Sequence, residues 1–144
     1  MKFLTTGFLL LLFSAVVFAQ KTATERPDRA ASSAAFAEVL LKKTELQAEL
    51  EGLSVEYTEE YPKVGELKHS IEMLDVQIGR LNAVKASDMG KLTAALGKLM
   101  VKKAELDTEL WVLLKTYKEG HPDVKKAQKK VDIFEAAIKQ IVGS

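Results

Sequence analysis

The feature that most constrains this chain is a segment that occurs twice, 60 residues apart. The first copy runs from Tyr57 to Val64 (YTEEYPKV) and the second from Tyr117 to Val124 (YKEGHPDV). The proline in each copy, Pro62 or Pro122, ends a preceding helix because it cannot donate the helical hydrogen bond. It also suits the first position of a new helix. Each copy is therefore predicted to be the turn of an antiparallel helical hairpin.

Apolar residues recur at spacings of three and four on both sides of each turn, as expected for amphipathic helices. The stripes flanking the first turn are Phe36, Val39, Leu46, Leu50, Leu53 and Tyr57, then Val64, Leu67, Ile71, Leu74, Ile78 and Leu81. Those flanking the second are Leu92, Leu96, Leu99, Leu106, Leu110, Leu113 and Tyr117, then Val124, Ala127, Val131, Phe134, Ile138 and Ile141. Lys43 and Lys103 fill the polar gap in their stripes and are predicted to lie near the open end of each hairpin.

The two halves match at an offset of 60. The residues that are identical to the residue 60 positions later are Ala34, Ala35, Lys42, Lys43, Glu45, Leu46, Glu49, Leu50, Leu53, Tyr57, Glu59, Pro62, Val64 and Ile78. This pattern indicates duplication of one hairpin. We predict an all-α fold of two tandem antiparallel hairpins, arranged as a four-helix bundle or as an extended coiled-coil oligomer. The predicted division is a signal peptide (1–19), a flexible leader (20–31), hairpin 1 (32–82), a linker (83–90) and hairpin 2 (91–142).

Several residues are predicted to end or begin these helices. Ser32 or Ser33 suits the N-cap of the first helix, and Ser87 or Asp88 that of the third. Gly120 is expected to adopt the left-handed conformation that often terminates a helix. Tyr57 and Tyr117 are expected to cover the end of the core with their rings while their hydroxyl groups reach backbone or water.

The amino end has the pattern of a secretory signal peptide. A basic start at Lys2 precedes an apolar run from Phe8 to Phe18, and small residues at Val17 and Ala19 favour cleavage before Gln20. The protein is therefore expected to be exported, to the periplasm or beyond. The alternative is an uncleaved membrane anchor formed by this segment, which would be the only membrane contact.

Charge and composition exclude several classes of function. Removing Lys2 takes the formal net charge from +1 to zero over residues 20–144. A nucleic-acid-binding protein would need a basic excess, so we expect no nucleic-acid partner. The chain contains no cysteine, and therefore no disulfide, thiolate metal site or cysteine nucleophile is available.

Few residues are candidates for chemistry. Glu66 and His69 have the spacing of a di-iron ligand pair, but Lys126 and Lys129 occupy the equivalent positions in hairpin 2 and would repel a cation. His69 is also expected to face outward. The acidic pairs Glu45/Glu49 and Glu105/Glu109 have the position of charges that flank a coiled-coil seam. We therefore predict a non-enzymatic protein with no catalytic residue, no cofactor and no metal site.

The clearest candidate for an interaction surface lies in hairpin 2. The third helix is apolar more than half way round, because Trp111, Val112 and Leu114 lie beside its main stripe. This surface must pack against the other hairpin or another chain. The densest basic cluster, Lys125, Lys126, Lys129 and Lys130, points outward from the fourth helix. It suits an anionic partner or a solvated helix face.

The hinges also resemble a known family. The pattern Leu50-x-x-Leu53-x-x-x-Tyr57-x-x-x-Tyr61-Pro62-x-Val64-x-x-Leu67 is similar to the periplasmic coiled-coil segment of polysaccharide chain-length determinants and exopolysaccharide co-polymerases. The second copy, with His121-Pro122, is closer to the usual form. The second membrane span and the α/β base of that family are absent from this sequence. The resemblance implies a helical hairpin of the cell envelope.

We therefore expect a structural or protein-interaction module of the bacterial envelope, linked to surface polysaccharide export, that self-associates or binds another envelope protein. One alternative is a periplasmic holdase-type chaperone that grips unfolded clients between its helices. Another is a metal-stress sensor or scavenger of helical-hairpin form.

Overall fold

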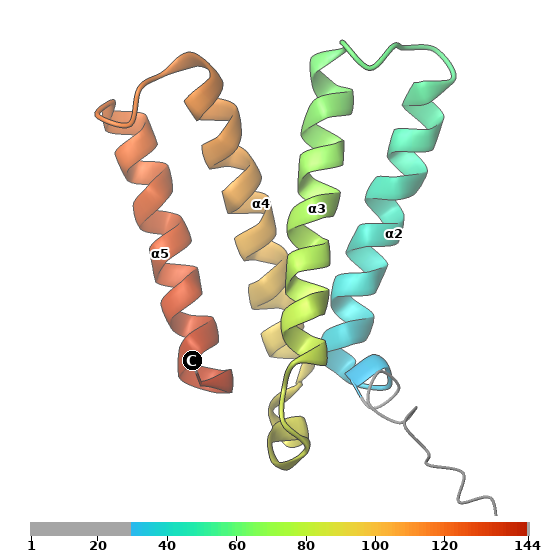
Figure 1. The fold of residues 1–144 in the computed structure, drawn as a ribbon, viewed down its shortest axis with the longest axis vertical. Coiled ribbons are helices and arrows are strands. Elements are labelled where there is room, and N and C mark those ends of the chain that lie inside the picture. The colour runs from blue at the N-terminus through green and yellow to red at the C-terminus, as the bar shows by residue number, and fades with distance from the viewer. Residues whose placement is uncertain (1–29, 144) are drawn as a thin grey trace, which may run out of the picture.

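The computed structural model describes residues 30–143, and within this range all the regular secondary structure is helical (Figure 1). The elements are α2 (Ala34–Ser54), α3 (Pro62–Asn82), the 3₁₀-helix η1 (Ala86–Lys91), α4 (Ala94–Thr116) and α5 (Pro122–Val142). Helices α2 and α3 form one antiparallel hairpin, and α4 and α5 form the other. The prediction of two tandem antiparallel hairpins in a helical bundle is confirmed. The predicted signal peptide and nearly all of the leader lie outside the described residues.

The internal repeat is preserved in three dimensions. Helix α5 begins and ends 60 positions after α3, and α4 begins 60 positions after α2. The Ser33 hydroxyl accepts a hydrogen bond from the Phe36 amide at 3.2 Å, and the Thr93 hydroxyl accepts one from the Leu96 amide at 3.3 Å. Ser33 is thus the predicted N-cap of α2. The prediction that Ser87 or Asp88 caps the third helix is wrong, because both residues lie within η1 and Thr93 caps α4.

Both prolines are the first residues of their helices, as predicted. The hinges are longer than expected, because α2 ends at Ser54 and leaves Tyr57 outside the helix. Gly120 was predicted to be left-handed, and this is wrong, since Gly143 is the one residue with positive φ in the described range. Helix α4 ends instead because Tyr117 is extended, with φ −118° and ψ 149°.

Helix α4 holds the bundle together. It packs against α2, α3 and α5, whereas α5 packs mainly against α4. Figure 1 shows both hinges at one end of the molecule and η1 at the other. The main apolar cluster joins both hairpins and consists of Ala30, Ala35, Val39, Leu74, Leu81, Leu92, Leu96, Met100, Ala104 and Ile138.

The hairpins approach each other closely at Gly97 of α4. A Cβ atom at this position would lie 2.7 Å from the Ala35 carbonyl oxygen and 2.7 Å from the Glu38 Cβ. The Ala35 amide also donates to the Leu92 carbonyl oxygen at 3.1 Å. Glycine therefore allows the amino ends of α2 and α4 to touch backbone to backbone.

Among residues 30–143, every helix is too short or too polar to cross a lipid bilayer.

Candidate interaction surface

Trp111, the first residue of the predicted surface, is half-buried between the hairpins. Its ring stacks on the His69 ring at a centroid distance of 4.4 Å and an interplanar angle of 7°. Lys115, which is also on α4, places its Nζ over the Trp111 ring, 3.4 Å from the ring centroid. The indole lies over Gly65, where an added Cβ would be in ordinary van der Waals contact with the ring at 3.9 Å. The expectation that His69 faces outward is wrong, because α4 covers that side of α3.

The lysines predicted near the open end of each hairpin make equivalent ion pairs. Lys43 of α2 binds Asp75 of α3, and Lys103 of α4 lies 3.8 Å from Glu135 of α5, which is the position 60 residues after Asp75. Lys103 also binds Asp107 at 2.7 Å. The repeat has therefore kept one interhelical charge pair in each hairpin.

Arg80 adds a link between hairpins, donating to both carboxylate oxygens of Glu135 at 2.9 and 3.0 Å. Partial burial acts to raise the pKa of the Glu135 carboxyl. The hydrogen bonds from Arg80 and the positive charges of Arg80, Lys103 and Lys139 outweigh burial, so the pKa of Glu135 is lowered.

Four of the carboxylates considered for acid–base or metal chemistry, Glu49, Glu66, Glu105 and Glu109, are engaged with lysines, and the fifth, Glu45, is exposed on α2. Glu105 lies 3.5 Å from the Lys42 Nζ and accepts a hydrogen bond from Lys102 at 3.1 Å. Glu109 accepts from Lys130 of α5 at 3.1 Å. Glu49 and Glu66 both lie within 4 Å of Lys63, at 3.8 and 3.7 Å. Within residues 30–143 no three histidine or acidic side chains gather in a metal-binding arrangement.

The hinge tyrosines stack across their own turns. The Tyr57 and Tyr61 rings are 4.4 Å apart, and the Tyr117 and His121 rings are 4.0 Å apart. Tyr57 is 44% exposed and Tyr117 is 40% exposed. The prediction that these rings close the core is therefore wrong. Each hinge instead presents a stacked aromatic pair to solvent, at the same end of the molecule (Figure 1).

The remaining predicted surface residues divide between two sides of hairpin 2. Leu114, Lys125 and Lys129 line a groove of about 540 Å³ between α4 and α5, together with Leu110, Val124, Glu119 and Gln128. Val112 lines a different groove of about 350 Å³ between α2, α3 and α4. Lys126 is paired with Asp123 at 3.8 Å, and Lys130 is paired with Glu109.

An exposed face of α2 was missed by the sequence reasoning. It carries Leu41, which is 59% exposed, and continues to Val55, which follows the last residue of the helix and is 85% exposed. The full face is Ala37, Leu40, Leu41, Thr44, Glu45, Ala48, Glu51, Gly52 and Val55, and all of these residues are exposed. The repeat could have indicated this face. The residues 60 positions later form the face of α4 that packs on hairpin 1, whereas the face of α2 has no such partner.

Comparison with known proteins gives no match: no family model fits the chain, and no curated protein or solved structure is significantly similar to it. The fold defines a class, a helical bundle made of duplicated hairpins. The likeness of the hinges to polysaccharide chain-length determinants stays a prediction.

Proposed function

We propose that this protein is a non-enzymatic interaction module of the bacterial envelope, which binds another envelope protein through its two hinges. The observation that carries the proposal is the pair of stacked rings at each hinge, Tyr57 with Tyr61 and Tyr117 with His121. Aromatic side chains that are rigid and exposed are common binding anchors, since they bury large area at little entropic cost. Both hinges lie at the same end of the bundle (Figure 1), so one partner can contact both pairs.

The charge arrangement is consistent with a supporting role for the helices beneath the hinges. Glu105 and Glu109 are held in ion pairs with lysines, so these carboxylates serve to join helices. The stacked rings of Trp111 and His69 connect α4 to α3 in the half of the bundle nearer the hinges, and they hold the two hinges in place. The bundle thus acts as a support for two aromatic tips.

Site-specific photo-crosslinking tests the hinge proposal. A photoreactive residue is placed at Tyr61 or at His121 in the full chain, and a matched one at Gln140, which is exposed near the opposite end of α5. We expect adducts of the same discrete mass from both hinge positions and none from position 140. Adducts from position 140 alone, or the absence of adducts from both hinges, would contradict the proposal.

Export and the link to polysaccharide are separate parts of the proposal, each with its own measurement. Fractionation followed by mass spectrometry is expected to find the protein in the periplasm or medium with Gln20 as its first residue. A cytoplasmic protein that begins at Met1 would refute export. Deleting the gene is expected to change the length distribution of surface polysaccharide on a gel, and an unchanged distribution would remove the polysaccharide link.

A further inference from the structure

The two hairpins are not related by a closed two-fold contact. Helix α4 packs on both α2 and α3, whereas α5 packs mainly on α4. A two-fold axis between the hairpins would exchange α2 with α4 and α3 with α5. Because α3 packs on α4, such an axis would require α5 to pack on α2 in the same way. Hairpin 1 therefore contributes the groove between α2 and α3 to the contact. Hairpin 2 contributes a different surface, which is one face of α4. Such a contact is heterologous, since it joins two different surfaces. The equivalent of each surface on the other hairpin is therefore left uncovered.

Both unused surfaces are present in this chain. The face of α4 that packs on hairpin 1 includes the buried residues Gly97, Met100, Ala104 and Thr108. Its counterpart 60 residues earlier is the exposed face of α2, with Ala37, Leu40, Thr44 and Ala48 at the same positions. Leu40 and Leu41 keep apolar character where Met100 and Val101 contact hairpin 1.

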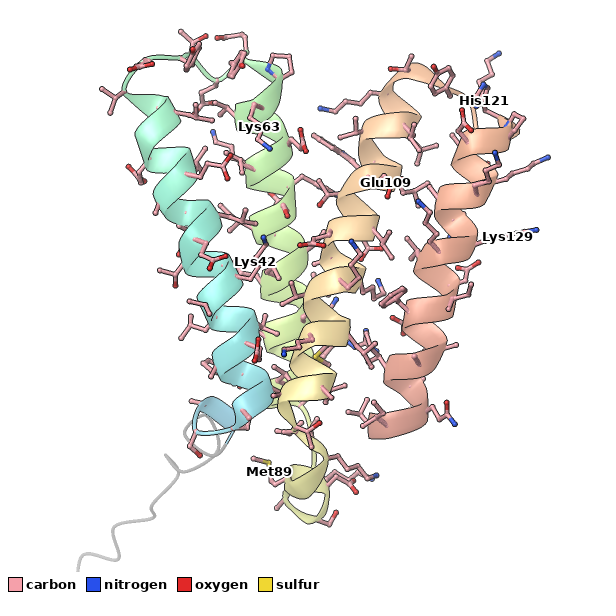
Figure 2. All side chains as sticks on the ribbon, turned by 180° about the vertical axis from the view of Figure 1, so that it is seen from behind. Lys42, Lys63, Met89, Glu109, His121 and Lys129 are labelled. Carbon is pink, nitrogen blue, oxygen red and sulfur yellow. The ribbon has the colours of Figure 1, made fainter. Side chains whose placement is uncertain are left out.

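The groove that receives α4 also has an open counterpart on hairpin 2. Lys42 and Ser70 line the groove on hairpin 1, and their counterparts Lys102 and Lys130 are exposed. Ile133, the counterpart of Met73, is 66% exposed. Lys129, the counterpart of His69, projects from the outer side of α5 in Figure 2. This flank of hairpin 2 is basic and uncovered within the chain.

We propose that a second copy of this chain docks the exposed face of its α2 onto the basic flank of α4 and α5, forming a head-to-tail assembly. The contact repeats the one between the two hairpins of a single chain. The proposal goes beyond the hinge-mediated function and is independent of it, because the docking surfaces lie on the flanks of the helices.

Charge complementarity selects a second copy as the occupant. Where Trp111 meets Gly65 and His69 inside the chain, Glu51 of the second copy meets Lys125 and Lys129. An aromatic contact is thus replaced by an acid opposite two bases.

The ion pair between Lys42 and Glu105 is preserved at the proposed contact. Lys42 lies 3.5 Å from Glu105 inside the chain, and the equivalent pair joins Lys102 to Glu45 of the second copy. Acidic and basic flanks of one molecule that match in this way favour one direction of assembly.

Two substitutions make the proposed contact weaker than the internal one. The counterpart of Arg80 is Gln140, so the charged pair of Arg80 with Glu135 has no equivalent. Gly97, which touches Ala35, is replaced by Ala37 at the equivalent position in α2. The extra methyl group prevents the same close approach of backbones, so the second copy sits further out. We therefore expect reversible assembly that depends on concentration.

Cysteine cross-linking tests the proposal, since the chain has no cysteine of its own. The full chain carrying both Glu51→Cys and Lys129→Cys is treated with a short bismaleimide. We expect a ladder of dimers, trimers and larger species on a denaturing gel. Each single variant is expected to stay monomeric, because copies of the same residue are not adjacent in a head-to-tail contact. The control pairs Glu51→Cys with Ser87→Cys, which is exposed in η1 at the end of the molecule opposite the hinges (Figure 1).

The ladder must be absent from the control pair. A monomer in the main experiment, or a dimer formed by either single variant, would overturn the proposal, the latter because it indicates a two-fold contact.

Charge reversal provides a second test. Glu51→Lys in the full chain is expected to weaken association by about tenfold, because a lysine then faces Lys125 and Lys129. Adding Lys129→Glu is expected to restore much of that loss. Light scattering over a concentration series measures the association, and circular dichroism checks that the helices persist. Unchanged association in Glu51→Lys would overturn the proposal. So would a chain that stays monomeric while its basic flank binds the polyanion heparin.

Discussion

The guanidinium of Arg80 donates to both carboxylate oxygens of Glu135, so that α3 of one hairpin is tied to α5 of the other. Two parallel hydrogen bonds of this kind fix orientation as well as distance. Lys103 and Lys139 lie 3.8 and 3.6 Å from the same carboxylate, and this cluster lies in the half of the bundle nearer η1. Glu135 is therefore the acidic centre of the contact between hairpins.

Glu135→Gln is expected to lower the free energy of unfolding at pH 7 by about 1 kcal/mol, as the charged hydrogen bonds are lost from a partly exposed site. Because the pKa of Glu135 is lowered in the folded state, its contribution is present above the unfolded pKa of about 4.3 and is lost as pH falls through the folded pKa. Urea unfolding between pH 7 and pH 3 measures this. The two proteins should converge in acid, whereas Glu56→Gln, an exposed control, should match the original protein throughout.

Gly97→Ala is expected to destabilise the fold by about 1–3 kcal/mol, because the new methyl group meets the backbone of Ala35 at less than contact distance. Gly79→Ala is the matched control, since no atom lies within 4 Å of its added Cβ. The control should gain up to about 1 kcal/mol from reduced backbone entropy in the unfolded chain. Thermal unfolding followed by circular dichroism compares them, and a stable Gly97→Ala would show that the hairpins can separate at this point.

His69→Ala is expected to shift the fluorescence emission of Trp111 to longer wavelength, because the indole loses the ring that covers it. Trp111 is the only tryptophan in the chain, so the emission reports on this contact alone. Lys68→Ala, on the exposed neighbouring position, should leave the emission unchanged. An emission maximum that does not respond to His69→Ala would mean that the hairpins are apart in solution near the hinges.

Ser33→Ala and Thr93→Ala are each expected to cost about 1 kcal/mol of stability, since each hydroxyl accepts from an otherwise unsatisfied amide at the start of a helix. Ser54→Ala serves as the control, because the Ser54 hydroxyl donates to the Leu50 carbonyl at the other end of α2. The control should be neutral in urea unfolding. Equal effects of all three substitutions would contradict the capping role.

The local features of the hairpins could be read from the sequence, because each depends on a few neighbouring residues. Pro62 and Pro122 begin helices wherever they occur at this spacing, and apolar stripes at three and four residues define which side of each helix is buried. The offset of 60 likewise predicted the repeat. The carboxyl ends of α2 and α4 were predicted less accurately. These helices end at Ser54 and Thr116 because of the hinge conformation, which no short sequence motif indicates.

The sequence by itself determined two amphipathic hairpins with proline hinges, because periodicity and backbone restrictions act within one turn of chain. Only the tertiary structure decided that α4 lies on α2 and α3, that Trp111 stacks on His69, and that a face of α2 stays exposed. The physical reason is that several apolar flanks compete for the same partners. Contacts such as Gly97 against Ala35, between residues far apart in sequence, choose among these arrangements.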